Sequence, residues 1–336
     1  MKHIELAVAM GLTTGIAWSC TDAPVDLDRS IGEPVLASGR SFAWSAPVTL
    51  GERVNSAATE QQPALSKDGL SLYFASNRSG GLGGFDMYVA QRACTDGCTW
   101  DTPEIVPTIN TVFPDISPSL SRDGHQLFFA SQRSNEHCTV SPTILQCDRD
   151  LWVSYREDVN NDFGWEEPVN LGDGINSSEQ ELAPSYFEND DAGPPQLFFN
   201  DGVVSGTALI AGDIYVSQLV NGVWGSPSKV PVSDALASDQ RPSISHDGLE
   251  LYFWSDRSGA SLLWIARRGS LNDLWSEPTR VEFPTTETSD RNTPTIQPFI
   301  HSHGNSETLV FVRGTVGVGT GRDLWMSERS RIDGSE

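Results

Sequence analysis

Acidic residues recur at one position relative to a repeated proline, and no other side chains in this sequence are better placed for chemistry. Three residues before each of four prolines stands an aspartate or a glutamate, and before a fifth proline stands an arginine with an aspartate beside it. These residues are Glu60, Asp115, Glu181, Asp239, Asp290 and Arg291, and the prolines are Pro63, Pro118, Pro184, Pro242 and Pro294. Carboxylates crowded together raise one another's pKa and favour a bound cation or a polyhydroxylated ligand. The fold of the repeat decides whether these residues meet.

Each proline opens a unit with the pattern of three short strands. In the clearest copy, an Asp-Gly pair at Asp68 marks a tight turn, strand formers run from Leu70 to Ser76, and a glycine-rich break precedes the next strand at Asp86. Successive units begin 52 to 66 residues apart, slightly more than the roughly 40–50 residues of common propeller blades. A tryptophan followed by a proline supplies a fourth strand after four of the units, at Trp100, Trp165, Trp224 and Trp275.

The tryptophan strands also predict how the chain closes. Five three-strand units are followed by only four such strands, and little chain remains after the last unit. The missing strand lies at the other end of the chain, around Trp44 to Val48. We therefore predict an all-β fold, a single β-propeller of five four-stranded blades over residues 41–331, in which the N-terminal strand completes the last blade.

The repeat resembles that of a known family. The pattern Pro-x-x-Ser-x-Asp-Gly-x-x-Leu-Tyr-Phe-x-Ser-x-Arg, followed by Asp-apolar-aromatic, is similar to the WD40-like propeller repeat of the TolB type, and it extends from about Phe42 to Arg331. The third unit lacks the arginine, the fourth has Leu262 in place of the strand-opening aspartate, and the fifth lacks the Asp-Gly turn. The six blades and the separate N-terminal domain of TolB itself are not evident. The resemblance implies the fold and a cell-envelope context rather than a particular role.

The first 20 residues have the pattern of an export signal. Lys2 precedes a mostly apolar stretch from Leu6 to Ile16, and small residues with a cysteine follow. Residues 1–20 thus resemble a bacterial lipoprotein signal in which Cys20 is lipidated, and an ordinary signal peptide cut nearby is the alternative. Residues 21–40 suit a flexible tether, and 332–336 form a C-terminal tail. We expect an exported protein, lipid-anchored to the cell envelope on its periplasmic or outer-membrane face, or otherwise secreted.

Composition limits the partners. The formal net charge of -23 repels nucleic acid and anionic membrane surfaces, so we expect neither as a partner. Past the N-terminus there is no run of about 20 apolar residues, so membrane attachment is expected only through a lipid anchor at Cys20. We expect a monomer whose partner is an envelope protein or a glycan.

The five cysteines fit an exported protein. Cys94 and Cys98 flank a short turn, and Cys138 and Cys147 flank a loop, so we predict the disulfides Cys94–Cys98 and Cys138–Cys147. Cys20 is then the odd cysteine, which lipidation accounts for. A metal site at Cys94-x-x-x-Cys98 is the alternative, but it needs further ligands, and no histidine or cysteine lies close in sequence.

Other recurring residues have a structural interpretation. The Asp-Gly aspartates are predicted to form turns, and the aromatic pairs of the second strands are predicted to pack between blades. The arginines that end the second strands are expected to bond the aspartates that open the third strands. These arginines are Arg78, Arg133, Arg257 and Arg313, and the aspartates are Asp86, Asp150, Asp213 and Asp323.

One loop resembles a calcium site. Asp158 to Gly164 carries oxygen-bearing side chains at alternate positions. Phe163 and Val169 stand where an EF-type loop needs a glycine and a glutamate, which favours a solvated hairpin. No metal or other cofactor is expected elsewhere.

Two interpretations of the repeated acids remain open. They form a carboxylate ring if they face the channel mouth, or they are architectural if they cap backbone N–H groups or pair with a neighbouring blade. Five-bladed propellers include arabinanase-type glycoside hydrolases, which set three carboxylates around the channel. Acids that repeat with the blade, however, do not differ from one another as catalytic residues must. The sequence favours a non-catalytic propeller that binds through one face or through its acidic channel, and a carbohydrate-active enzyme is the alternative.

Overall fold

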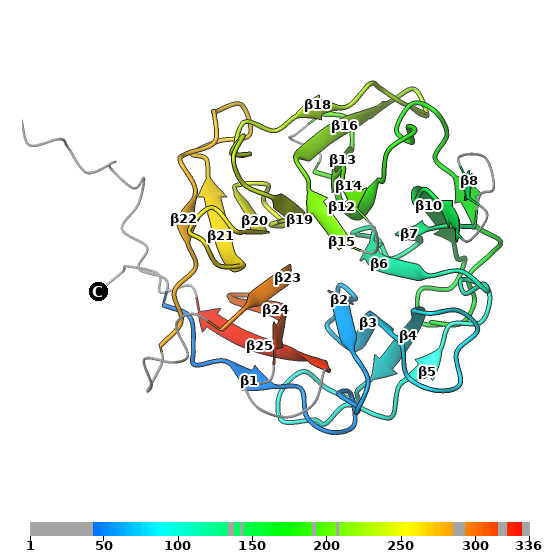
Figure 1. Ribbon diagram of the computed structural model, residues 1–336. Helices are drawn as coiled ribbons and strands as arrows, with labels where there is room; N and C mark the ends of the chain where they lie inside the picture. The colour runs from blue at the N-terminus through cyan, green and yellow to red at the C-terminus, as the bar shows by residue number, and fades with distance from the viewer. Residues whose placement is uncertain are drawn as a thin grey trace, which may run out of the picture. The chain divides into compact units, whose positions relative to one another are not determined.

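The structure is a computed structural model that describes residues 43–133, 138–141, 144–189, 193–205, 208–284, 293–314 and 321–330. No helix occurs in these ranges, and therefore none that could span a membrane. The strands form five small sheets arranged in a ring around a common centre (Figure 1). The prediction of an all-β propeller with five four-stranded blades is confirmed.

Each blade is an antiparallel sheet whose first strand lies innermost. Blade one contains β2 (Glu60–Leu65), β3 (Ser71–Ser76), β4 (Asp86–Gln91) and β5 (Glu104–Ile105), and blade two contains β6 (Asp115–Leu120), β7 (Gln126–Ser131), β10 (Asp150–Tyr155) and β11 (Val169–Asn170). Blade three contains β12 (Leu182–Phe187), β13 (Gln196–Asn200) and β16 (Ile214–Val220), with β17 (Val223–Trp224) and β18 (Ser228–Lys229) both paired to β16. Blade four contains β19 (Asp239–Ile244), β20 (Glu250–Ser255), β21 (Leu262–Arg267) and β22 (Thr279–Arg280). Blade five contains β23 (Thr295–His303), β24 (Ser306–Gly314), β25 (Arg322–Ser330) and the N-terminal β1 (Val48–Thr49).

Two hairpins extend the links between second and third strands. β8 (Cys138–Ser141) pairs with β9 (Ile144–Cys147) in blade two, and β14 (Val203–Ser205) pairs with β15 (Ala208–Ala211) in blade three. The inner strands β2, β6, β12, β19 and β23 each contact the next one around the ring, and β23 contacts β2. The ring is therefore closed at its centre.

The hydrophobic core lies between the blades. Tyr73 and Val89 of blade one pack with Leu127 and Phe129 of blade two, and all four side chains are buried. Successive residues of a strand point to opposite faces of its sheet, so each blade contributes to the core on both of its sides. The predicted packing role of the second-strand aromatic residues is confirmed.

A bulge shapes every inner strand. In all five blades the register between the first and second strands shifts at the same point, where one non-glycine residue has a positive φ of 52° to 62°. These residues are Gln62, Ser117, Ala183, Arg241 and Gln297. A left-handed backbone conformation is unusual for a residue with a side chain, and its fivefold recurrence shows that the ring imposes it.

The bulges correct the predicted register of the fifth unit. A proline follows each bulge residue, and in blade five that proline is Pro298, four residues after Pro294. The position of the four repeated acids is therefore held in blade five by Thr295, which lies opposite Arg313. The two prolines are close together, and no Asp-Gly turn is present in this unit to mark its register.

The N-terminal strand closes the ring as predicted. β1 pairs with β25, and the Ser45 N–H donates to the Glu328 carbonyl over 2.8 Å. Trp44 is buried edge-on against Tyr252, with ring centroids 6.3 Å apart, and the guanidinium of Arg329 lies 4.6 Å from its ring centroid. Residues near opposite ends of the described chain thus hold the last blade together.

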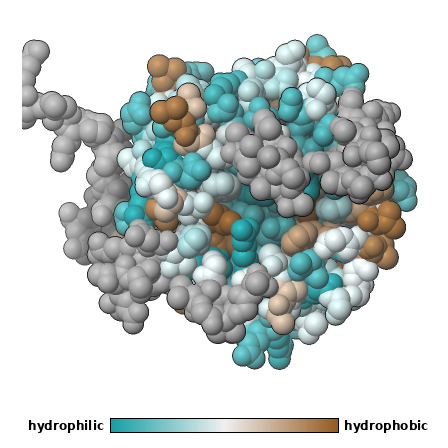
Figure 2. Space-filling model, viewed as in Figure 1, coloured by the Kyte–Doolittle hydropathy of each residue, from teal (hydrophilic) through white to brown (hydrophobic). Residues whose placement is uncertain are grey.

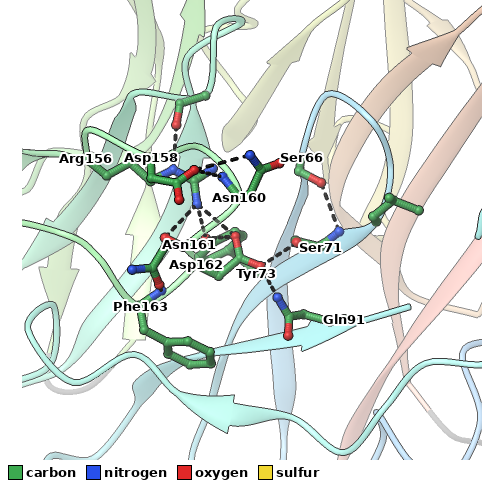
Figure 3. Close-up of polar contacts among 12 residues, drawn as sticks. Ser66, Ser71, Tyr73, Gln91, Arg156, Asp158, Asn160, Asn161, Asp162 and Phe163 are labelled. Atoms are coloured by element: carbon green, nitrogen blue, oxygen red, sulfur yellow. Dashed lines mark hydrogen bonds and ion pairs between the residues drawn. The ribbon is translucent and has the colours of Figure 1, made fainter. Parts of the chain in front are cut away.

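A buried ionic network joins blades one and two (Figure 3). The Asp162 carboxylate accepts hydrogen bonds from Ser71, Tyr73 and Gln91 of blade one at 2.5, 2.7 and 2.7 Å, and it pairs with Arg156 at 2.8 Å. Burial raises the pKa of Asp162, but the hydrogen bonds together hold that pKa below its usual value.

The loop Asp158–Gly164 joins strands three and four of blade two and is mostly exposed, as predicted, but its Asp162 is buried. Asp158 and Asn160 are exposed, but Asp162 is turned into the interface between blades, and its oxygens bond protein groups. Across the described ranges, no group of three or more His, Cys, Asp or Glu residues is positioned to hold a metal ion.

Candidate functional site

The repeated acids lie at the end of the ring where the inner strands begin, which we call the loop face. The opposite end, which carries the Asp-Gly turns, is the turn face. The Glu60, Asp115 and Asp239 side chains are fully buried, and each pairs with the arginine just beyond the second strand of its own blade. The pairs are Arg78–Glu60 at 3.0 Å, Arg133–Asp115 at 2.7 Å and Arg257–Asp239 at 2.7 Å.

These three carboxylates also bind the backbone of the segment that leads into their blade. Glu60 accepts the Ser56 N–H at 3.0 Å, and Asp115 and Asp239 accept equivalent bonds from Thr111 and Asp234, both at 2.6 Å. Each carboxylate therefore ties the incoming segment to the second strand of the blade. The structure places these predicted site residues in architectural contacts.

The predicted bond between the second-strand arginine and the third-strand aspartate is wrong in blade one. Arg78 turns to Glu60, whereas Asp86 accepts the backbone N–H groups of Leu82 and Gly83 at 3.0 and 3.1 Å. Arg78 also donates to the backbone carbonyl of Val54 at 2.7 Å, which holds its guanidinium against the segment that leads into the first strand.

Glu181 of blade three differs from the other acids. No arginine accompanies it, because the second strand there ends in residues 200–202, Asn-Asp-Gly. The Ser177 hydroxyl donates to one carboxyl oxygen, and the Ser177 backbone also interacts with the carboxyl. Burial, and to a smaller extent the charges of Asp150 and Asp148, outweigh these two contacts and raise the pKa of Glu181 to about 7. A carboxyl of this kind can hold a proton at neutral pH.

Some predicted residues lie outside the part of the chain that the structure describes. They are Cys20, Asp290 and Arg291, and the predicted signal peptide, tether and C-terminal tail lie outside it as well. The Cys94–Cys98 disulfide is present, with the two Cα atoms 5.3 Å apart, so that prediction is confirmed. Cys138 and Cys147 lie opposite each other in the β8–β9 register, but their side chains fall outside the description, and this disulfide stays a prediction.

The two faces differ in their connections. At the loop face, the segments that join second and third strands are long in blades two and three, where each contains a hairpin. At the turn face, first and second strands are joined by tight turns, as at Asp68, which accepts a hydrogen bond from Ser66 at 2.6 Å, and Gly69, which has a φ of 70°. The aspartates of the Asp-Gly pairs are turn formers, as predicted. Because a rigid scaffold commonly presents its binding residues on loops, the loop face is the better candidate for a site.

A small cavity of about 30 Å³ lies in the central channel. Its lining combines the five bulge residues, the five prolines that follow them, and the next residue of four blades. These are Gln62, Pro63, Ser117, Pro118, Ser119, Ala183, Pro184, Ser185, Arg241, Pro242, Ser243, Gln297, Pro298 and Phe299. Figure 2 shows a hydrophilic hollow near the middle of the ring. Because proline has no N–H group, the donors of this lining are the side chains of the bulge residues and serines.

Arg241 brings a charge into this lining, and sequence analysis missed it. It stands at the bulge position, where the other blades have a glutamine, a serine or an alanine. The only feature of the sequence that could have pointed to Arg241 is its place two residues after a repeated acid, Asp239. Only the structure shows that the bulge turns this position toward the channel.

A wider recess of about 110 Å³ opens toward the turn face. Tyr186, Phe187 and Phe299 contribute to its wall, together with His246 and His301. His301 is buried, which with the nearby His303 lowers its pKa to about 4, so its imidazole is neutral at pH 7.

Comparison with known proteins finds similarity in the fold. No protein-family model matches it, and no curated protein sequence matches it. Among solved structures, the α-L-arabinofuranosidase PaAbf62A from Podospora anserina is 12% identical with a TM-score of 0.55, covering 87% of this chain and 97% of that one. The catalytic domain of a GH62 α-L-arabinofuranosidase from Coprinopsis cinerea is 12% identical with a TM-score of 0.57, covering 86% and 97%. A putative TolB from Agrobacterium tumefaciens is 17% identical with a TM-score of 0.45, covering 83% and 80%. The arabinofuranosidase likenesses show a shared fold alone, that of the five-bladed β-propeller.

Proposed function

We propose that this protein is a non-catalytic binding propeller that binds the end group of a glycan at the loop-face mouth of its central channel. One observation carries the proposal: Glu60, Asp115 and Asp239 are fully buried and ion-paired with arginines. Carboxylates that hold the blades together are not free to act as acid, base or nucleophile on a sugar.

The cavity admits only a small group of a ligand. About 30 Å³ is well below the roughly 300–1,000 Å³ of small-molecule pockets, so the rest of the glycan would lie at the mouth of the channel. A protein partner, the other class that the sequence leaves open, would have to bind the rim of the loop face. We propose the export and the lipid anchor at Cys20 as the context, which would present the propeller to glycans of the cell envelope or its surroundings.

A carbohydrate-active enzyme is the second candidate, and Glu181 is the observation that favours it. Its pKa of about 7 suits a general acid, and the charges of Asp148 and Asp150 act on it. Glycoside hydrolysis needs a second carboxylate as base or nucleophile in addition to this acid.

Photo-crosslinking tests the proposal. The purified full chain would be screened against immobilised plant and bacterial glycans, and bound glycans would be re-synthesised with a diazirine at their non-reducing end. We expect crosslinks to inner-strand residues 60–63 and 115–118 and to the loops of the loop face. Crosslinks confined to the turns around Asp68 and Asp123 would contradict the proposed face.

Product analysis separates binding from turnover. Incubation of each bound glycan with the protein should release no sugar by chromatography. Release that is lost in Glu181→Gln would establish the enzyme and overturn the non-catalytic assignment. Failure of every glycan to bind would remove the proposal altogether.

A further inference from the structure

We propose that Arg149, Arg241 and Arg322 form an anion site at the loop-face end of the channel, and that it binds the carboxylate of a sugar acid. This inference rests on the proposed glycan-binding function and narrows its ligand to an acidic sugar. The three arginines come from different blades and are far apart in sequence.

The fold brings these arginines to one end of the ring. Arg149 and Arg322 stand at equivalent positions, one residue before the aspartates Asp150 and Asp323 of the third strands. The Arg149 carbonyl accepts the Glu181 N–H at 2.9 Å, so this arginine lies at the junction of blades two and three on the loop face. Arg241 lines the channel itself, and the charges of Arg149 and Arg322 both act on it.

None of the three has a carboxylate partner within the described part of the chain. The Arg241 guanidinium has Ser117 Oγ at 3.4 Å, and Arg149 donates to Gln180 Oε1 at 3.1 Å, while Arg149 Nε is buried without a partner. Arg322 is exposed. Arg149 and Arg241 are half-buried, whereas the buried Arg156 is neutralised by a carboxylate. Burial, with the two neighbouring arginines, lowers the pKa of Arg241 to about 9, the direction expected of a cation that lacks a counter-charge.

Gln62 provides a second, independent observation. It is 5% exposed and lines the cavity, and its Oε1 accepts the Ser117 N–H at 3.1 Å. Its Nε2 is buried with no hydrogen-bond partner among the described residues. A buried amide donor without a partner costs roughly 1–3 kcal/mol, so a bound acceptor would stabilise it. Together with the arginines, it supplies donors without matching acceptors, which is the chemistry of an anion site.

The rest of the lining adds further donors. The hydroxyl oxygens of Ser119, Ser185 and Ser243 each accept a backbone N–H from the next blade, at 3.2, 3.1 and 2.9 Å. Their hydroxyl protons are left to donate to a carboxylate oxygen that enters the cavity. The net charge of -23 opposes multivalent anions most strongly and a single carboxylate least. Arginine binds a carboxylate through two parallel hydrogen bonds, which adds orientation to charge.

Calorimetry with the purified full chain tests this inference. The probes are D-galacturonate, D-galactose as its uncharged counterpart, and inorganic phosphate. We expect galacturonate to bind at least tenfold more tightly than galactose and than phosphate. Arg241→Gln should weaken galacturonate at least tenfold and leave galactose unchanged. The matched control is Arg122→Gln, which removes the same charge from the turn face and should leave both affinities unchanged.

Thermal melting without ligand gives a readout that a structural role would not produce. Because Arg241 is an uncompensated charge, Arg241→Gln should raise the Tm of the free protein and abolish the rise that galacturonate causes in the wild type. Unchanged galacturonate affinity in Arg241→Gln, or a preference for phosphate, would overturn the inference. Neutral glycans that bind with no preference for galacturonate would overturn it too, while leaving the proposed function standing.

Discussion

The Asp162 network offers the sharpest test of how the blades are held together. Asp162→Asn is nearly isosteric, but it removes the charge that neutralises Arg156. Both side chains are almost fully buried, at 3% and 2% exposed. Breaking one partner of a buried ion pair typically costs about 3–5 kcal/mol, because the remaining charge stays buried without compensation. We therefore expect the free energy of unfolding to fall by about that amount at pH 7.

Equilibrium urea unfolding followed by tryptophan fluorescence measures this change. Asp158→Asn is the matched control, because it makes the same substitution at an exposed position of the same loop. We expect the control to change the free energy of unfolding by no more than about 0.5 kcal/mol. Arg156→Met combined with Asp162→Leu should cost less than Asp162→Asn alone, since the pair removes both buried charges together.

The pH dependence adds a second readout. The folded-state pKa of Asp162 lies below its usual value, so the stabilisation from its carboxylate is fully present above the unfolded pKa of about 3.9. It is lost as pH falls through the lower folded-state pKa. The stability difference between wild type and Asp162→Asn should therefore shrink below pH about 4. A loss under about 1 kcal/mol at pH 7, or an equal difference at pH 3 and pH 7, would refute the reasoning.

Two further predictions concern Glu181 and Trp44. The folded-state pKa of Glu181 is raised to about 7 from 4.5, so its ionisation destabilises the fold as pH rises from about 4.5 to 7, by about 2–3 kcal/mol. Glu181→Gln should consequently be more stable than wild type at pH 8 and similar at pH 4 in urea titrations, and a variant less stable at pH 8 would contradict this. Trp44→Ala should lower the free energy of unfolding by about 3–5 kcal/mol, because a buried indole is removed from the closing blade. Limited proteolysis should then cut near residues 43–50 before any other site. First cuts elsewhere would contradict the role of the N-terminal strand in closing the ring.

The fold was predictable because its signals are local and repeat. Asp-Gly turns, runs of strand formers and a tryptophan strand occur in most units. The last unit has no tryptophan strand after it, so the segment around Trp44 at the other end of the chain is identified as the strand that closes the ring. The fifth unit shows where such reasoning fails. Pro294 and Pro298 both fit the pattern, and only the backbone bulge at Gln297 selects the second.

The candidate site was only partly predictable. The spacing of acids correctly indicates one structural position, but it does not reveal that this position is a buried ion pair in blade one and a carboxyl bonded to Ser177 in blade three. Arg241 has no motif of its own, and its significance depends on Arg149, which is 92 positions away in the chain. Neither the raised pKa of Glu181 nor the placement of the three arginines at one face follows from residue type and spacing.

By itself, the sequence determined the all-β class, the number of blades and the strand that closes the ring. These depend on periodicity, turn residues and side-chain alternation, which are properties of short segments. The tertiary structure alone decided which charges are neutralised, because desolvation and Coulomb energy depend on distances between residues of different blades. The same spacing from a proline that gives Glu60 an arginine partner leaves Glu181 without one, and the same ring that buries three carboxylates places Arg149, Arg241 and Arg322 at its loop face.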